Sequence, residues 1–259
     1  MTPRVQTPQD GIAWVTGAGT GIGRATALEL ARRGWRVAIS ARRAETLDAL
    51  AAELPGQFIV APCDVTDAAA VAQTVRDLET AHGPVALAFL NAGISIHVRA
   101  PNIDLAAVRQ IHDVNVMGAF HCIGALLPAM VARKGGQIAI CASVAGYGGL
   151  PYASAYTASK AAMINAAVAL AIECRALGVL VQCVNPGFVD TPLTRKNDFP
   201  MPFLMQVEEA GQRVADGLAR RSFEITFPRR FATLLKLLNL LPYGLYIRLV
   251  AWGIARKPV

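Results

Sequence analysis

The amino-acid sequence predicts an α/β fold built on a doubly wound parallel sheet. Three observations lead to this prediction. Short apolar runs alternate with segments of helical periodicity, a glycine-rich turn directly follows the first apolar run, and polar residues come where several of these runs end. Strands of a parallel sheet are buried on both faces and therefore read as continuous apolar runs.

Six apolar runs are expected to be strands, and a seventh, shorter one follows them near the end of the chain. The strands are expected at 12–16, 35–40, 57–62, 85–91, 136–143 and 179–185, with 223–227 as the seventh. The helices are expected at 22–33, 44–54, 67–82, 104–133 and 157–176. With right-handed crossovers, the carboxyl ends of all these strands meet at one edge of the sheet, where ligands of such folds bind.

Composition excludes several classes of protein. Of the 259 residues, 54% are hydrophobic and 17% are charged, which argues against disorder. The five cysteines include no CxxC pair, and neither they nor the four histidines have metal-ligand spacing, so no metal site is expected. No motif of a nucleic-acid binder accompanies the basic charge, and the N-terminal residues lack a signal-peptide pattern, so we expect a cytoplasmic protein.

The glycine-rich turn TGAGTGIG, at 16–23, links the first strand to the first helix. Glycines allow the backbone to turn tightly and to approach a pyrophosphate, and the free amides at a helix start favour its negative charge. The alternative is an ordinary tight turn between a strand and a helix. Because this turn follows the first strand, we interpret Gly17, Gly19, Thr20, Gly21 and Ile22 as a dinucleotide-binding loop.

The end of the second strand indicates which nicotinamide cofactor is bound. An NAD site usually has an acidic residue there for the adenosine ribose, but this sequence has Ser40, Arg42 and Arg43 with no carboxylate before Glu45. Arginine binds phosphate through a bidentate fork, so Arg42, helped by Arg43, is suited to the 2′-phosphate of NADP. We therefore expect NADP rather than NAD, although two solvated arginines at a helix start would give the same pattern.

Tyr156 and Lys160 lie in the stretch YTASK, one helical turn apart. In a helix, positions i and i+4 project from the same face, which makes the phenol and the ammonium neighbours. A neighbouring cation favours the ionised phenol, so the pair is suited to proton transfer. A surface helix with a tyrosine and a lysine is the alternative that YTASK alone would favour.

The whole set of motifs resembles the short-chain dehydrogenase/reductase family. The resemblance covers about residues 10–191 and rests on TGAGTGIG, CDV at 63–65, NAG at 91–93, Asn115 in DVNVMG, Ser143 in CASVAG, YTASK, and NPGFVDT at 185–191. It implies a Rossmann-type sheet of about seven strands and a hydride transfer between a nicotinamide and a ketone, aldehyde or alcohol. It also implies a homodimer or homotetramer.

The same resemblance assigns roles to individual residues. It makes Tyr156 the general acid/base, Ser143 a donor to the substrate oxygen, and Lys160 the residue that holds the nicotinamide ribose. Asn115 would shape a local helix distortion and position a water in the proton relay. The remaining cofactor contacts that it implies are Asp64 and Val65 at the adenine, Asn91, Ala92 and Gly93 along the cleft, Pro186 and Gly187 across the cofactor, and Val189 and Thr191 at the nicotinamide amide.

The last part of the chain leaves the family pattern. We expect residues 10–228 to form the nucleotide-binding domain, with 192–222 as a substrate lid, and 229–259 to form a helical extension broken at Pro242. The lid includes Phe199, Met201 and Phe203, which suits a lipophilic substrate, although helices packed on the core would need the same residues. Residues 220–259 carry 8 basic side chains and 1 acidic one, while 1–219 carry 17 of each. Packing on the core, a partner subunit and peripheral membrane contact through 229–257 remain open for the extension.

The sequence thus predicts an NADP-dependent oxidoreductase that acts on a lipophilic carbonyl compound or alcohol. A non-catalytic NADP-binding regulator or a membrane-associated redox sensor on the same fold is the alternative. The joint presence of Ser143, Tyr156 and Lys160 argues against the alternative, because a sensor needs no proton donor.

Overall fold

The computed structural model describes residues 2–196 and 200–255, and in these residues the predicted parallel sheet is confirmed. Seven strands pair in the order β3-β2-β1-β4-β5-β6-β7, and each neighbouring pair is parallel. The strands are β1 (Ile12–Thr16), β2 (Val37–Ser40), β3 (Phe58–Val60), β4 (Val85–Leu90), β5 (Gly136–Cys141), β6 (Val179–Pro186) and β7 (Glu224–Phe227).

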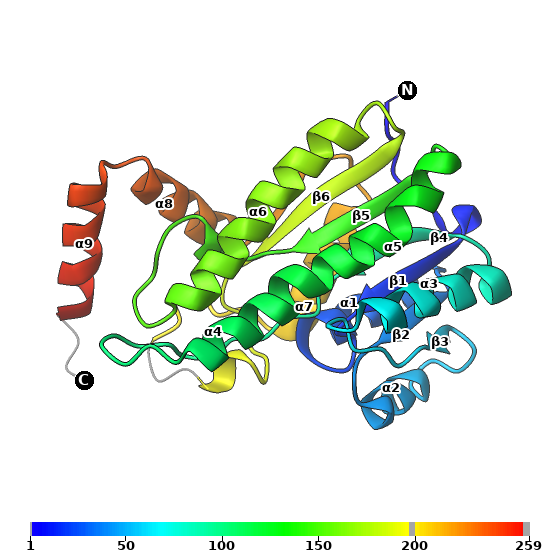
Figure 1. Cartoon of the computed structure of the whole chain (residues 1–259), viewed down its shortest axis with the longest axis horizontal. Coiled ribbons are helices and arrows are strands. Elements are labelled where there is room, and N and C mark those ends of the chain that lie inside the picture. Colours follow the sequence, from blue (N-terminus) through cyan, green and yellow to red (C-terminus); the bar gives the residue numbers. More distant parts are fainter. Residues whose placement is uncertain (1, 197–199, 256–259) are drawn as a thin grey trace.

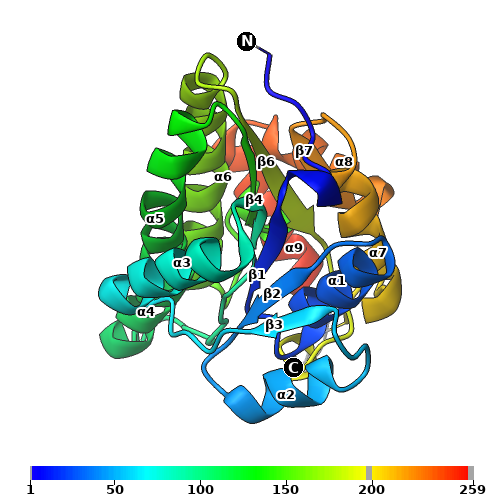
Figure 2. The ribbon, with the colours of Figure 1, turned by 90° about the vertical axis from the view of Figure 1, so that its right-hand side faces the viewer.

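Helices cover both faces of the sheet (Figures 1 and 2). The α-helices are α1 (Gly21–Arg32), α2 (Ala44–Ala51), α3 (Ala68–His82), α4 (Leu105–His112), α5 (Gly118–Ala132), α6 (Ser154–Cys174), α7 (Val207–Leu218), α8 (Arg229–Asn239) and α9 (Tyr243–Ala255). In Figure 2, α1 and α7 lie on one side of the sheet, and α3, α5 and α6 lie on the other. This arrangement leaves the carboxyl ends of the strands open at one edge.

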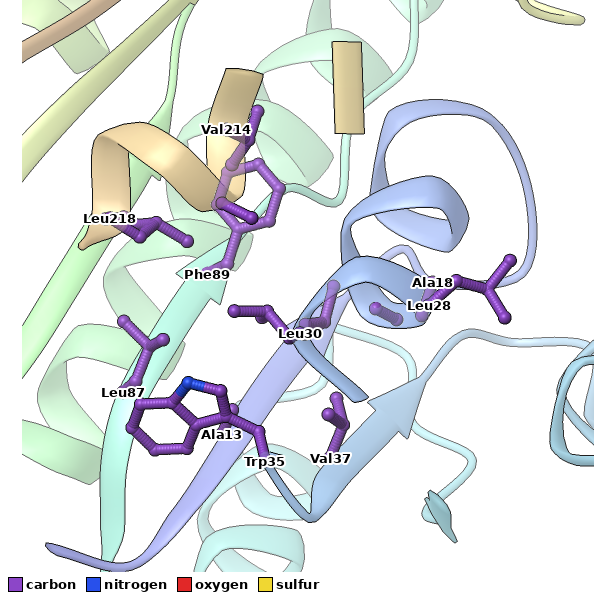
Figure 3. Close-up of a cluster of buried hydrophobic side chains, with 14 of the residues drawn as sticks. Ala13, Ala18, Leu28, Leu30, Trp35, Val37, Leu87, Phe89, Val214 and Leu218 are labelled. Atoms are coloured by element: carbon purple, nitrogen blue, oxygen red, sulfur yellow. The ribbon is translucent and has the colours of Figure 1, made fainter. Parts of the chain in front are cut away.

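Two apolar layers hold the helices to the sheet. On the α1 and α7 face, Phe89 of β4 points toward Val214 and Leu218 of α7, and Trp35 packs beside Leu87 (Figure 3). On the opposite face, a second cluster includes Trp14, Leu90, Leu126, Ile138 and Met163. Because successive side chains of a strand alternate between faces, both layers draw on the same strands.

The element boundaries differ from the predicted ones where tertiary contacts decide them. Trp35 was expected to begin the second strand, but it precedes β2 and fills the core from a loop. The helix expected at 104–133 contains a π-helical turn, η2 (Asp113–Met117), which separates α4 from α5. Such turns insert one extra residue into the helical ladder and recur at functional sites. Its centre is Asn115, where a helix distortion was expected from the family resemblance.

Two long apolar segments meet the length and composition of a membrane span: Leu105–Ala132 and Ser154–Cys174. In the fold both cover one face of the sheet, and their inner residues belong to the second apolar layer. Length and composition alone therefore do not make these helices membrane spans.

The C-terminal extension forms two helices, α8 and α9, with Pro242 between them, as predicted. The expected lid region divides in two. Residues 200–206 lie near the strand edge, with a bridge between Val189 and Met205, whereas α7 packs on the core through Val214 and Leu218. Phe199 and residues 256–259, which the sequence analysis assigned to the lid and the extension, lie outside the described residues.

Candidate active site

A cleft of about 660 Å³ opens at the carboxyl ends of the strands. It collects residues that are far apart in the sequence, from the turn after β1 to the segment after β6. The predicted site residues that line it are Gly17, Gly19, Thr20, Gly21, Ile22, Arg42, Arg43, Asp64, Val65, Asn91, Ala92, Gly93, Ser143, Tyr156, Lys160, Pro186, Gly187, Val189 and Thr191. All predicted site residues except Ser40 and Asn115 therefore face one cavity.

The glycine-rich loop is held against the end of β4. The Asn91 amide nitrogen donates to the backbone oxygens of Thr16, at 3.1 Å, and of Gly17, at 3.3 Å. A Cβ at Gly17 would lie 2.8 Å from the Cα of Ala92, so no larger residue fits there, and its φ of +65° also favours glycine. The Thr20 side chain makes no cap bond with the start of α1, so it leaves the first amides of the helix free for a ligand, and Gly21 and Ile22 of this turn line the cleft. This cradle fits a pyrophosphate.

Arg42 and Arg43 line the cleft where β2 leads into α2. Neither guanidinium forms an ion pair with any residue in the described part of the chain. Asp64 also lines the cleft, and its carboxylate accepts hydrogen bonds from the amide and the hydroxyl of Thr66, at 3.0 and 2.8 Å. Two cations without a protein counter-charge beside a dinucleotide-sized cleft suit a phosphate group.

Ser143, Tyr156 and Lys160 line the same cleft. Ser143 follows β5, and its hydroxyl oxygen lies 3.3 Å from the Pro186 carbonyl, to which it donates. The Lys160 ammonium lies 5.7 Å from the centre of the Tyr156 ring, so the two side chains are neighbours, as their spacing predicts. Both residues come from the first half of α6, which begins at Ser154.

The Lys160 ammonium is buried, with 5% of the residue exposed. It donates one hydrogen bond to the Cys141 backbone oxygen, at 2.9 Å, although an ammonium has three donors. A Cβ added at Gly93 would lie 3.5 Å from the ammonium nitrogen, which places this cation beside the NAG backbone. Because a buried cation needs further partners, its remaining donors suit the hydroxyls of a ribose in the cleft.

Asn115 does not line the cleft, but it fixes two segments that do. Its side-chain oxygen accepts from the Ile94 amide at 2.7 Å, and its nitrogen donates to the Ile94 oxygen at 3.0 Å and to the Ser159 hydroxyl at 3.0 Å. Asn115 thereby joins the backbone after NAG to the helix of Tyr156 and Lys160. The π-helical turn around it aims this side chain inward.

Ser40 lies below the cleft and does not line it. The residue is fully buried, its hydroxyl donates to the Ala61 oxygen at 2.6 Å, and it accepts from the Trp14 indole nitrogen at 2.9 Å. Its backbone oxygen accepts from the Ala18 amide at 3.0 Å, which supports the glycine-rich loop from beneath. Because its hydroxyl is hydrogen-bonded within the core, Ser40 supports the glycine-rich loop and does not offer its side chain to a ligand.

Several lining residues were not found by sequence reasoning. They are Ala41, Thr46, Cys63, Ile94, Val114, Cys141, Ala142, Pro192, Leu193, Thr194 and Lys196. Lys196 comes shortly after the NPGFVDT motif, and its charge near that motif was the available signal. Thr46 carried no such signal, because its approach to Gly19 depends on how α2 packs.

The cysteine nearest to the catalytic set is not a candidate nucleophile. Burial raises the pKa of the Cys141 thiol, and Lys160 only partly offsets this effect. The thiol is therefore neutral at physiological pH and unreactive. Within 2–196 and 200–255, no group of three or more His, Cys, Asp or Glu side chains converges as a metal site.

Comparisons with known proteins agree with this geometry. A family model described as short chain dehydrogenase matches residues 11–200. An uncharacterized oxidoreductase of Myxococcus xanthus is 40% identical over 237 residues, which cover 90% of this chain and 94% of the relative. A 3-oxoacyl-(acyl-carrier-protein) reductase of Synechocystis is 34% identical, covering 71% of this chain and 76% of the relative. A cyclohexanol dehydrogenase of Acinetobacter is 32% identical, covering 79% and 86%.

A solved structure extends the comparison to the fold. A short-chain dehydrogenase from Streptomyces avermitilis superposes with a TM-score of 0.81, covering 95% of this chain and 97% of that one at 24% identity. At this level of identity the similarity concerns the fold alone.

Proposed function

The chain belongs to the short-chain dehydrogenase family, which makes it an oxidoreductase with a nicotinamide cofactor, and from this premise we propose that it is an NADP-dependent enzyme interconverting a carbonyl compound and an alcohol. The observation that carries the proposal is that one cleft is lined both by the glycine-rich loop with Arg42 and Arg43 and by Ser143, Tyr156 and Lys160. Neither arginine forms an ion pair with another described residue.

The preference for NADP rests on charge at the adenosine end. The 2′-phosphate is a dianion near neutral pH, and the side chains of Arg42 and Arg43 are the cations closest to the end of β2. An NAD site would need an acceptor for the ribose hydroxyls at this position. The first polar side chain there, Ser40, is committed to Ala61 and Trp14 and does not supply one.

The protein's own residues supply the proton and position the substrate and the cofactor. The bound cofactor supplies the hydride to the carbonyl carbon. The Ser143 hydroxyl, which donates to the Pro186 oxygen in this structure, turns its single hydrogen to the substrate oxygen and orients it. The Tyr156 hydroxyl gives its proton to that oxygen as the alcohol forms. Lys160 holds the ribose and stabilises the phenolate that remains on Tyr156, and a proton from solvent restores it. Alcohol oxidation runs through the same groups in reverse.

We propose carbonyl reduction of lipophilic compounds as the main activity, because cellular NADPH is normally held reduced. Leu193 and Ile94 line the cleft, and the nearby Phe203 and Leu204 are exposed on the segment 200–206. An apolar entrance of this kind favours a lipophilic substrate. The relatives named for a cyclic alcohol and for 3-oxoacyl groups are consistent with a C=O or CH–OH substrate.

The proposal includes two further expectations, a homo-oligomer and a cytoplasmic location. Val168 and Ile172 are exposed on the outer side of α6, so we expect this face to pack against a second subunit in a homo-oligomer. All five cysteines are free thiols, which supports a cytoplasmic enzyme.

The test is a Tyr156→Phe variant, assayed with NADPH and NADH over a panel of ketones, aldehydes and alcohols. Turnover should fall about 10²- to 10⁴-fold with NADPH binding retained, because only the proton donor is removed. Tyr152→Phe is the matched control, since Tyr152 is a half-exposed tyrosine that does not line the cleft. Unchanged turnover in Tyr156→Phe would remove this residue from the reaction.

A further inference from the structure

The C-terminal extension exposes an unusual density of large apolar side chains. Among the described residues, 8 of the 20 exposed large hydrophobic side chains lie between residues 234 and 252. They are Leu234, Leu237, Leu240, Tyr243, Leu245, Ile247, Leu249 and Trp252. Scattered exposed leucines need no explanation, but this many large apolar side chains exposed on two adjoining helices mark an interaction site.

The extension is a defined part of the structure. The inner face of α8 packs through Phe231 and Ala232 on Val144 and Phe188 of the core. The ammonium of Lys236 bonds the Glu224 carboxylate, which also accepts from the Tyr147 hydroxyl at 2.6 Å. These contacts hold α8 in a fixed position, with Leu234 and Leu237 exposed on its outer side and Leu240 exposed just after its end.

In contrast to α8, in which Phe231 and Ala232 are buried, α9 has no fully buried residue among its described side chains. Its Tyr246 hydroxyl donates to the Gly149 oxygen at 2.8 Å, and Tyr246 and Val250 are the half-buried members of the helix. Figure 1 shows α9 at the edge of the molecule, beyond α8 and away from the sheet. A helix with this composition is stable in water only if something apolar covers it, so the surface requires an external partner.

Charge identifies the kind of partner. Residues 220–259 contain 8 basic side chains and 1 acidic one, and that acid, Glu224, is already neutralised by Lys236. Arg229, Arg230 and Arg248 are exposed and form no ion pair with any described residue. A second copy of this surface would bring like charges together, whereas an anionic lipid headgroup layer would neutralise them.

From these observations we propose that the outer face of α8 together with α9 binds the surface of an anionic lipid bilayer. The leucines and Ile247 enter the boundary between headgroups and acyl chains, Tyr243 and Trp252 lie at headgroup level, and the arginines contact lipid phosphates. The helices lie on the membrane without crossing it, because Lys236, Pro242 and Arg248 interrupt the apolar run.

The position of this surface also bears on substrate access, an inference that rests on the proposed function. The Phe231 ring of α8 lies 5.6 Å from the ring of Phe188 and 6.0 Å from that of Phe203, which belongs to the segment beside the cleft. The inner side of α8 thus adjoins this segment, and a bilayer on the outer side of α8 would lie one helix diameter, roughly 10 Å, from it. A lipophilic substrate could pass over this distance from the membrane to the cleft.

The test is co-sedimentation of the full chain with vesicles of phosphatidylglycerol and phosphatidylcholine, and with vesicles of phosphatidylcholine alone. We expect binding to the anionic vesicles that falls steeply as salt is raised, and weak binding to the neutral ones. Vesicle binding does not require turnover, so this test is independent of the proposed reaction.

Two sets of variants separate the apolar and the ionic contributions. Leu237→Ser with Leu240→Ser should lower vesicle binding about tenfold or more, while the matched pair Leu105→Ser with Leu177→Ser, two exposed leucines elsewhere, should not. Glutamine at Arg229, Arg230 and Arg248 should weaken binding by a similar factor, while glutamine at Arg32, Arg76 and Arg175 lowers the net charge equally without this effect.

Two results would overturn the proposal. One is failure of the unchanged protein to sediment with anionic vesicles at low salt. The other is a smaller assembly for the Leu237→Ser, Leu240→Ser pair in light scattering, with no change in vesicle binding, because that would show a second copy of the chain covering the surface.

Discussion

The nucleotide-binding part and the C-terminal extension place their apolar side chains in opposite ways. Every residue of β1 and β4 is buried, whereas α9 has no buried residue among its described side chains. The charges differ as well, because residues 1–219 are electrically balanced and residues 220–259 are strongly basic. The first part therefore completes its own core and leaves a cleft at the strand ends, while the second leaves apolar and basic surface for something outside the chain.

The two lysines Lys160 and Lys236 show the same contrast in single residues. Lys160 is buried in the cleft and uses one protein acceptor, the Cys141 oxygen. Lys236 lies 5.1 Å from the centre of the Tyr147 ring, is partly exposed, and is paired with Glu224. We infer that Lys160 is held ready for a ligand, while Lys236 attaches the extension to the core.

Replacing each of these two lysines with methionine should give the largest difference between the two regions. Lys160→Met should lower turnover about 10²- to 10⁴-fold and weaken NADPH binding, because the ribose and the phenolate both lose their cation. Lys236→Met should leave turnover close to that of the unchanged protein. Steady-state kinetics and NADPH titration measure both effects, and equal losses in the two variants would contradict the distinct roles.

Truncation of an apolar side chain should separate the two regions in stability. Phe89→Ala should lower the free energy of unfolding by about 3–5 kcal/mol, since the ring is fully buried between β4 and α7. Leu237→Ala, at a side chain that is 58% exposed, should change it by less than about 0.5 kcal/mol. Urea unfolding of the soluble protein measures both, and a large loss in Leu237→Ala would show that α8 is covered within the chain.

Reversal of the charge at Arg42 should affect one cofactor more than the other. Arg42→Asp should weaken NADPH binding about 10- to 100-fold, as expected for lost charge-assisted contacts, and change NADH binding far less. Arg32→Asp, an exposed arginine of α1 outside the cleft, is the control. Equal effects of Arg42→Asp on the two cofactors would refute the phosphate assignment.

The contacts of Glu224 predict a smaller, pH-dependent effect on the attachment of α8. Burial alone would raise the pKa of this carboxyl, but hydrogen bonds from Lys236, Tyr147 and Asn185 outweigh burial and hold the pKa below its usual value of 4.5. Because the pKa is lowered in the folded state, the ionised group stabilises the fold above pH 4.5, and this contribution is lost as pH falls through the folded value.

Glu224→Gln should accordingly be less stable than the unchanged protein near pH 7, and the difference should shrink toward about pH 3.5. Thermal unfolding at the two pH values measures this, with Glu208→Gln, an exposed carboxylate of α7, as the control. A difference that is constant with pH would show that ionisation of Glu224 does not stabilise the fold.

Sequence reasoning predicted the structure correctly where the signal is local: the hydrophobic periodicity of a segment and the residues that end it. The strand positions and the parallel sheet follow from alternating apolar runs, and the cleft residues follow from strand ends, because parallel strands share one edge. It did not show that Ser40 points into the core, since that depends on Trp14 and Ala61 from neighbouring strands. Nor could it show that α9 would be left uncovered, because an apolar helix gives the same pattern whether it is buried or exposed.

The central claim, that one cleft holds NADP with Tyr156 beside its reactive ring, is tested most directly by a crystal structure of the chain with NADP bound. We predict the 2′-phosphate between Arg42 and Arg43, the ribose within hydrogen-bond reach of Lys160, and the Tyr156 hydroxyl facing the nicotinamide across a space that admits a substrate. A Tyr156 hydroxyl turned away from the ring, or a 2′-phosphate remote from both arginines, would contradict the account.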